Sequence, residues 1–172
     1  MKEGEIAFTQ FVRTRGLGLL RFATALSGDR HHAEDVLQNV LERAYPRWAK
    51  IAAHGDPEWY LRRSIVNAVK DGWRAKQRRP EIVGLPEEGW EASYLPFDAV
   101  VTRDAVRRAL NNLPQGQRTV VVLRYWEGLT EAETAQIMGV SLGTVKSQGH
   151  RAVRALREQL ALQEQTMARW EQ

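Results

Sequence analysis

Apolar residues recur at intervals of three and four along most of the chain, and no stretch alternates convincingly as a strand would. The first such pattern, over residues 6–26, predicts a helix that we expect to be irregular around Gly16 and Gly18. Ser27-Gly28-Asp29 then indicates the end of this helix and the start of another. A second apolar stripe, over residues 33–45, predicts that next helix, which Pro46 should end or kink. The N-terminal part is therefore expected to be helical.

A third helix is predicted after Asp56, which is well placed as an N-cap, with Pro57 as the first helical residue. One side of this helix is apolar and is formed by Leu61, Ile65, Ala68, Val69 and Trp73. The other side, through Arg79, is basic apart from Asp71 and carries Arg62, Arg63, Lys70, Arg74, Lys76, Arg78 and Arg79. Such a side either binds nucleic-acid phosphates or is simply solvated, and the residues alone leave both interpretations open.

The composition changes over residues 80–98, which contain three prolines, two glycines and five acidic residues but no basic residue. This combination is typical of a linker between two modules. We therefore expect an all-α fold of two small helical domains, residues 1–79 and 99–172, joined by a flexible acidic linker.

The second domain contains the pattern of a helix-turn-helix. A helix ending at Pro114 and another over residues 118–126 precede it. Thr130 and Glu133 then form a capping box that starts a helix, and Gly139 supplies the positive φ of a sharp turn. Val140 and Val145 are expected to fill the angle between the two helices. Ser141 is expected to cap the next helix, whose N-terminal end faces the major groove in this motif.

The last helix separates its residues onto two faces. The packing face is formed by Val145, Gly149, Ala152, Leu156 and Leu160. The opposite face is polar and basic and presents Lys146, Ser147, His150, Arg151 and Arg154. A helical hairpin with a basic exterior would share some of these features, but the cap, the turn glycine and the segregated faces together favour DNA binding.

The composition of the chain excludes several classes of protein. The 172 residues carry a net charge of +4 and a pI of about 9.7, a mild indication of a polyanionic partner. Without cysteine, and with four histidines that lack metal-ligand spacing, the chain predicts no metal site and no cofactor. There is no apolar run of the roughly 20 residues that a bilayer requires, and the N-terminus is too acidic for a signal peptide. We expect a cytoplasmic protein without membrane contact.

Two blocks of sequence resemble the extracytoplasmic-function (group IV) sigma factors of the sigma-70 superfamily, and look closest to their SigE-like branch. Region 4 of that family is similar to LPQGQRTVVVLRYWEGLTEAETAQIMGVSLGTVKSQ. The core-binding part of region 2 is similar to LSGDRHHAEDVLQNVLERAYPRW, and its promoter-melting part to DPEWYLRRSIVNAVKDGWRAKQRR. The order of the blocks and the length of the linker match as well.

The resemblance implies a function in promoter-specific transcription initiation and assigns residues to it. Contacts with core RNA polymerase (the β′ clamp helices, with the β flap as a second contact) would include Asp35, Gln38, Leu41 and Glu42. The −10 element would be met by His54, Arg62, Arg63, Asn67, Lys70 and Arg74, while Trp59 and Tyr60 either stack on bases or belong to the core. The −35 element would be met by Arg124, Ser141, Thr144, Lys146, Ser147, His150 and Arg151. An anti-sigma factor is a plausible further partner.

Departures from the family pattern occur at Asn39, where an acid is common, and at Gln148-Gly149, where a basic–apolar pair is common. A free-standing transcription regulator would explain residues 99–160 but would leave the AEDVLQ segment and the basic helix without a role. An enzyme is not expected, because no phosphate loop, nucleophile elbow or metal cluster is present, and no small-molecule substrate is expected either.

Overall fold

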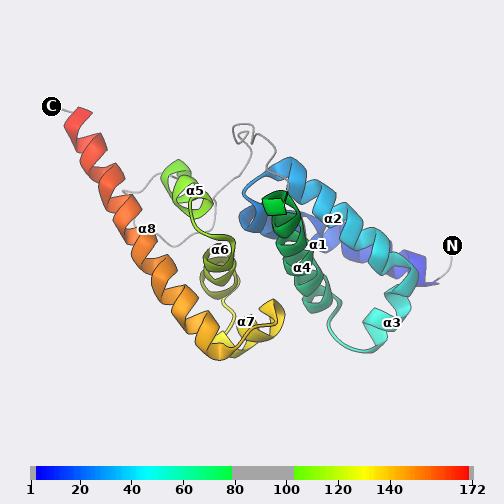
Figure 1. The fold of residues 1–172 in the computed structure, drawn as a ribbon. Helices are drawn as coiled ribbons and strands as arrows, with labels where there is room; N and C mark the ends of the chain where they lie inside the picture. Colours follow the sequence, from blue (N-terminus) through cyan, green and yellow to red (C-terminus); the bar gives the residue numbers. More distant parts are fainter. Residues whose placement is uncertain (1–2, 79–102, 171–172) are drawn as a thin grey trace. The chain divides into compact units, whose positions relative to one another are not determined.

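A computed structural model describes the backbone of residues 3–78 and 103–170, and the side chains of residues 4–75 and 105–162. Every regular element in these ranges is helical, in agreement with the all-α prediction (Figure 1). The linker expected at residues 80–98 lies outside the described residues. The contacts divide the chain into two compact units, Met1–Gly89 and Trp90–Gln172.

The first unit contains α1 (Glu3–Ser27), α2 (Arg30–Ala44), the 3-10 turn η1 (Tyr45–Arg47), α3 (Trp48–Ala53) and α4 (Pro57–Arg78). Helices α1, α2 and α4 pack against one another in pairs (Figure 1). Their core is formed by side chains that are fully buried, among them Leu19, Phe22, Leu26, Leu61 and Ile65. Trp48 is also buried and makes an edge contact with the ring of Phe8 and a tilted contact with that of Phe11.

The irregularity expected in the first helix is absent, because α1 runs unbroken through Gly16 and Gly18. Neither glycine has a positive φ. Each costs the helix about 1 kcal/mol relative to alanine. The burial of Leu19, Phe22 and Leu26 just beyond them outweighs that cost, since each contributes about 1.5–3 kcal/mol.

The predicted helix boundaries in this unit are confirmed by their hydrogen bonds. At the start of α2 the carboxylate of Asp29 accepts a hydrogen bond from the backbone N–H of His32 at 2.6 Å. Pro46 ends the α-helical part of α2, and the chain continues as η1. Asp56 accepts from the N–H of Glu58 at 2.9 Å, and α4 begins at Pro57.

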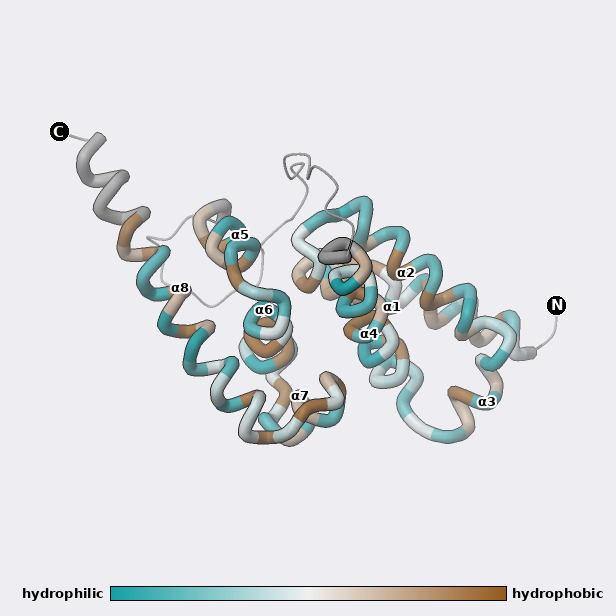
Figure 2. The backbone as a smooth tube through the Cα atoms, in the orientation of Figure 1, coloured by the Kyte–Doolittle hydropathy of each residue, from teal (hydrophilic) through white to brown (hydrophobic). Residues whose placement is uncertain are grey.

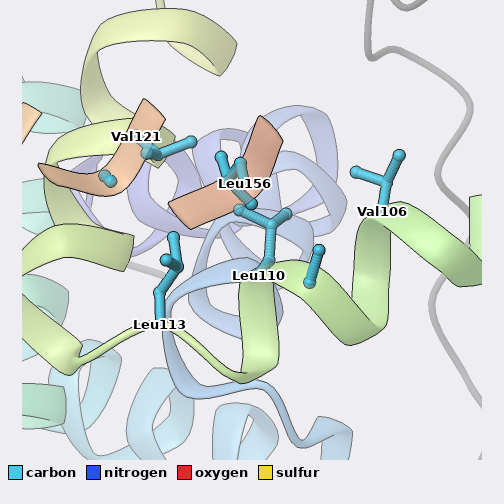
Figure 3. Packing of buried hydrophobic residues seen from close by; sticks show 7 residues of the cluster. Val106, Leu110, Leu113, Val121 and Leu156 are labelled. Atoms are coloured by element: carbon cyan, nitrogen blue, oxygen red, sulfur yellow. The ribbon is translucent and has the colours of Figure 1, made fainter. Parts of the chain in front are cut away.

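The second unit contains α5 (Arg103–Asn111), α6 (Gln115–Val121), the π-helical turn η2 (Val122–Trp126), α7 (Glu131–Met138) and α8 (Leu142–Trp170). The helix predicted from Arg118 therefore starts three residues earlier, directly after Pro114, and its last turn is a π-helix. Hydrophobic positions recur along α6 and α8 among hydrophilic ones (Figure 2). Side chains of α5, α6 and α8 meet in one cluster, in which Leu110 and Leu156 lie close together (Figure 3).

Arg118 is a charged residue inside this core. Its guanidinium donates to the backbone oxygens of Leu110 at 3.0 Å, Asn111 at 2.6 Å and Leu113 at 3.5 Å. It thereby supplies partners to the carbonyls at the C-terminal end of α5. Burial lowers the pKa of Arg118 to about 10, so the side chain stays charged at neutral pH. Arg118 had been predicted only as part of a helix, and its role depends on contacts that the sequence pattern does not show.

In the described part of the chain, no helix is long and apolar enough to span a bilayer. The same residues contain no group of three or more histidine, aspartate or glutamate side chains that would hold a metal ion.

Candidate nucleic-acid interface

The turn between α7 and α8 has the geometry that its sequence predicts. The hydroxyl of Thr130 accepts from the N–H of Glu133 at 3.2 Å, and the Glu133 carboxylate accepts from the N–H of Thr130 at 2.7 Å. The Thr130 hydroxyl also donates to the Glu133 carboxylate, at 2.6 Å, and this bond, together with the one from the Thr130 N–H, lowers the pKa of Glu133. Gly139 ends α7 with φ at 65°, in the left-handed region that favours glycine. The predicted capping box and turn are thus confirmed, and α7 and α8 form a helix-turn-helix (Figure 1).

Helix α8 starts with a second cap. The Oγ of Ser141 accepts from the N–H of Thr144 at 3.1 Å and lies 2.9 Å from the Oγ1 of Thr144. Val145 is 1% exposed and anchors the first turn on the domain core, as predicted. Val140, which was expected to fill the angle between the helices with Val145, is only half-buried.

Several of the side chains that were predicted for the −35 element are exposed along one part of α8. They are Lys146, Ser147, His150 and Arg151, while Thr144 is half-buried. Lys146 is 55% exposed, and its Nζ lies 3.8 Å from a carboxylate oxygen of Glu131 on α7. The arrangement presents hydroxyl, imidazole and cationic groups at the N-terminal half of a helix whose opposite face is buried. Such a face can bind phosphates and the edges of bases.

Arg124 lies apart from this group, on the π-helical turn η2. Its guanidinium donates a hydrogen bond to the carbonyl oxygen of Leu129 and is half-buried. The side chain therefore supports the loop that leads into α7.

Gln148-Gly149, the departure from the family pattern, lies on the opposite face of α8. A Cβ at Gly149 would lie 3.5 Å from Cγ1 of Val120, an ordinary van der Waals contact. The Gln148 side chain covers Gly116, because a Cβ added at Gly116 would lie 3.3 Å from the Gln148 amide nitrogen. Both residues thus lie against α6. Gly149 is on the packing face, as expected, but the contact there leaves room for a methyl group.

In the first unit, the loop between α3 and α4 borders a hollow of about 480 Å³. Four residues singled out in the sequence line it, namely His54, Trp59, Tyr60 and Arg63, together with the loop residues Gly55 and Asp56. Ile51 completes the lining with Arg47 and Lys50, two cations that were missed. Arg47 and Lys50 are three residues apart and precede a loop rich in turn residues. This spacing could have placed both on the same side of a short helix.

The remaining residues predicted for the −10 element do not line this hollow. Arg62 is bound within the protein: its Nη2 lies 2.7 Å from Glu58, and its guanidinium lies 5.1 Å from the centre of the Phe22 ring. Arg74 is exposed, 3.9 Å from Asp71, while Asn67 is exposed and Lys70 half-buried on α4. Trp73, which was expected in the core, is half-buried.

A second concave surface lies between α1 and α2 and also has a volume of about 480 Å³. It is mainly apolar, with a polar rim, and is lined by Phe8, Leu20, Glu34, Leu37, Gln38, Leu41, Glu42 and Tyr45. Three of the four residues predicted to bind polymerase belong to it, and Gln38 donates to Glu42 at 2.9 Å. Asp35 is exposed on α2 but is not among the lining residues. We call this surface the α1–α2 groove.

One edge of the α1–α2 groove is an aromatic residue held by an acid. The hydroxyl of Tyr45 donates to Glu5 at 3.3 Å, and the charge of Glu5 raises the pKa of Tyr45. The Tyr45 ring also makes an edge contact with Phe8. Aromatic and apolar side chains thus form one side of the groove. Phe8 and Leu20 belong to α1, whereas the residues predicted to bind polymerase belong to α2.

Comparison with known proteins finds the same two regions. Residues 11–79 match the family described as Sigma-70 region 2, and residues 103–156 match Sigma-70, region 4. RNA polymerase sigma-E factor of Streptomyces coelicolor is 41% identical over 162 residues, which cover 91% of this chain and 88% of the relative. ECF RNA polymerase sigma factor SigL of Mycobacterium tuberculosis is 34% identical over 149 residues, covering 85% of this chain and 83% of the relative.

Solved structures agree with this assignment. The sigma factor RpoE of Bartonella quintana, solved in complex with the anti-sigma factor NepR, matches with a TM-score of 0.72 and 25% identity. The match covers 90% of this chain and 97% of the other. CnrH, solved with the cytosolic domain of CnrY, has the same fold at a TM-score of 0.61 and 21% identity. By sequence and by fold, the chain belongs to the extracytoplasmic-function RNA polymerase sigma factors of the sigma-70 family.

Proposed function

We propose that the two units of this sigma factor have separate roles. Residues 1–79 would bind core polymerase and the −10 element, and residues 99–172 would bind the −35 element. Residues 80–98 would connect them. The observation that carries the proposal is the helix-turn-helix: Gly139 ends α7, Ser141 caps the recognition helix α8, and α8 exposes a basic face. A partner for that face is double-stranded promoter DNA.

For the −35 element, the binding residues on α8 are Ser141, Thr144, Lys146, Ser147, His150 and Arg151. Arg151 and Lys146 suit phosphates or the acceptors of guanine, and His150 and the hydroxyls suit either bases or backbone. Arg124 acts through the loop that it holds, since its guanidinium is engaged by Leu129. Its contribution to binding would therefore be indirect.

For the −10 element, the hollow beside the α3–α4 loop suits an unstacked base. Its lining includes the rings of Trp59, Tyr60 and His54 and the cations Arg47, Lys50 and Arg63. An aromatic wall favours stacking, and the cations favour the phosphates on either side of the base. Asn67, Lys70 and Arg74 extend the same helix and would follow the strand, whereas Arg62 is engaged with Glu58 and Phe22.

For core polymerase, the contact surface is the α1–α2 groove together with Asp35. An apolar centre with a polar rim is the usual composition of a protein interface. Leu41 supplies apolar area, and Gln38 and Glu42 supply hydrogen-bonding groups at the rim. We assign this surface to the β′ clamp helices, and we assign a further contact, by the second unit, to the β flap.

An anti-sigma factor is a further partner that we propose, because the RpoE match was solved with one bound. Such a partner would cover DNA-binding or polymerase-binding residues and so keep the protein inactive. The protein would act where promoter DNA and polymerase meet, which in a bacterium is the cytoplasm. We propose no catalytic activity of its own.

The test is run-off transcription with core polymerase and a genomic promoter library, in the presence and absence of this protein. Transcripts that start at discrete sites sharing two spaced elements are the expected result, and they would also identify the promoter sequence. Tight binding of a duplex by the protein alone, without any new transcript, would contradict the proposal and favour a free-standing regulator.

A further inference from the structure

Leu142 is the first residue of the recognition helix α8, and its side chain is 43% exposed. The apolar residues that follow it on the packing face, Val145, Ala152 and Leu156, are all buried. Leu142 was not among the residues predicted to contact DNA. An exposed leucine is unremarkable on most surfaces, but this one lies at the part of a helix-turn-helix that meets base edges.

The position of Leu142 relates it to the proposed DNA-binding side chains. Leu142, Lys146 and His150 are spaced by four residues, so they lie one above the other along α8. All three are exposed. Leu142 therefore forms the N-terminal end of a stripe that continues with a cation and an imidazole.

The hydroxyls around the start of α8 form hydrogen bonds within the helix and its cap. The hydroxyls of Ser141 and Thr144 lie 2.9 Å apart, and Ser141 also accepts from the N–H of Thr144. Ser147 donates to the carbonyl of Thr144 at 3.0 Å. Gly143 adds no side chain, and a Cβ there would meet only the Ser141 hydroxyl, at 3.8 Å. Leu142 thus supplies the exposed apolar side chain of this turn.

We propose that Leu142 is a specificity-determining residue that contacts the C5-methyl group of a thymine in the −35 duplex. The inference rests on the proposed function of α8. The thymine methyl is the apolar feature of the major groove, and apolar side chains recognise it by contact. Covering one methyl group corresponds to about a fourfold change in affinity.

The experiment uses holoenzyme reconstituted from core polymerase and the full chain, on a promoter obtained by run-off selection. Each thymine of the −35 element, on both strands, is replaced singly by deoxyuridine, which removes only the methyl group. The dissociation constant of the promoter is measured for the wild-type protein and for Leu142→Ala. At one thymine we expect a loss of about fourfold with the wild-type protein and none with Leu142→Ala.

A matched control is Leu162→Ala, the same substitution at an exposed leucine 20 residues further along α8. This variant should retain the full deoxyuridine penalty. Equal penalties in wild type and Leu142→Ala at every thymine would overturn the inference, as would a −35 element without thymine. Failure of the proposed function would look different: scrambling the whole −35 element would then leave binding unchanged even with the wild-type protein.

Discussion

Thr134 on α7 is fully buried, and its hydroxyl has no hydrogen-bond partner among the described residues. A buried hydroxyl without a partner reduces stability, because it has lost its hydrogen bonds to water. Replacing it by a methyl group of the same shape should therefore help. We expect Thr134→Val to raise the free energy of unfolding by about 1 kcal/mol, measured by urea denaturation.

A matched control for that prediction is Thr119→Val on α6. Thr119 is 4% exposed, but its hydroxyl donates to the carbonyl of Gln115 at 2.8 Å. The same substitution there removes a hydrogen bond and should give no gain. If both variants changed stability equally, the unsatisfied hydroxyl of Thr134 would not be the cause.

At the scale of an element, α8 contains a glycine in its interior that its packing does not require. A Cβ at Gly149 would lie 3.5 Å from Val120, so an alanine fits without displacing its neighbour. Gly149→Ala should stabilise the protein by about 0.5–1 kcal/mol, because alanine favours the helix and restricts the unfolded chain. Urea denaturation gives the comparison with wild type.

The opposite result is expected at the end of α7. Gly139 has φ at 65°, where a Cβ is strained whatever the free space around it. Gly139→Ala should therefore destabilise the protein by about 1 kcal/mol or more. A gain at both glycines, or a loss at both, would contradict the conformations that the structure assigns to them.

The capping box of α7 predicts a dependence of stability on pH. Hydrogen bonds from Thr130 lower the pKa of Glu133 below its usual value of 4.5. A carboxylate whose pKa is lowered by folding stabilises the protein above its unfolded pKa, and this contribution is lost as the pH falls through the folded pKa. The advantage of wild type over Glu133→Gln, in melting temperature, should therefore be present at neutral pH and shrink below about pH 4.5.

That measurement has an internal control, since every other carboxylate is common to both proteins. A difference in melting temperature that stays constant from neutral to acidic pH would show that the charge of Glu133 contributes nothing through the capping box.

At the scale of the whole molecule, each unit has its own buried core, and this leads to a prediction about separate functions. Lys146→Ala and Arg151→Ala remove exposed cations from α8 and should weaken binding to the −35 duplex, with a smaller salt dependence. Both residues belong to the second unit, whereas the α1–α2 groove belongs to the first, so the affinity for core polymerase should stay unchanged. Both affinities can be measured by fluorescence anisotropy at several salt concentrations.

The reciprocal variant is Leu61→Ala in the core of the first unit, where the side chain is fully buried. The cavity should cost about 2–5 kcal/mol of stability in that unit and weaken polymerase binding. Binding of the −35 duplex by the second unit should persist. Loss of polymerase binding in Lys146→Ala, or of duplex binding in Leu61→Ala, would contradict the division into two units with separate roles.

Much of the fold could be predicted from sequence because its signals are local. The caps at Asp29, Asp56 and Thr130 each depend on hydrogen bonds between residues two or three apart. The turn at Gly139 depends on the φ of a single residue. Errors arose where packing competes with propensity, as in α1, which stays helical through two glycines because its apolar residues are buried.

By itself, the sequence determined the helical class, the helix-turn-helix and the two faces of α8, since all of these follow from spacing along one helix or one turn. Only the tertiary structure decided which side chains are available to a partner. Arg62 lies on Phe22, 40 residues away, and Arg118 serves the end of another helix. Arg47, at the end of η1, and Lys50 on α3 line the hollow beside the α3–α4 loop together with Tyr60 and Arg63 of α4, because α3 packs against both η1 and α4. Contacts between separate helices set these positions, and hydrophobic periodicity carries no information about them.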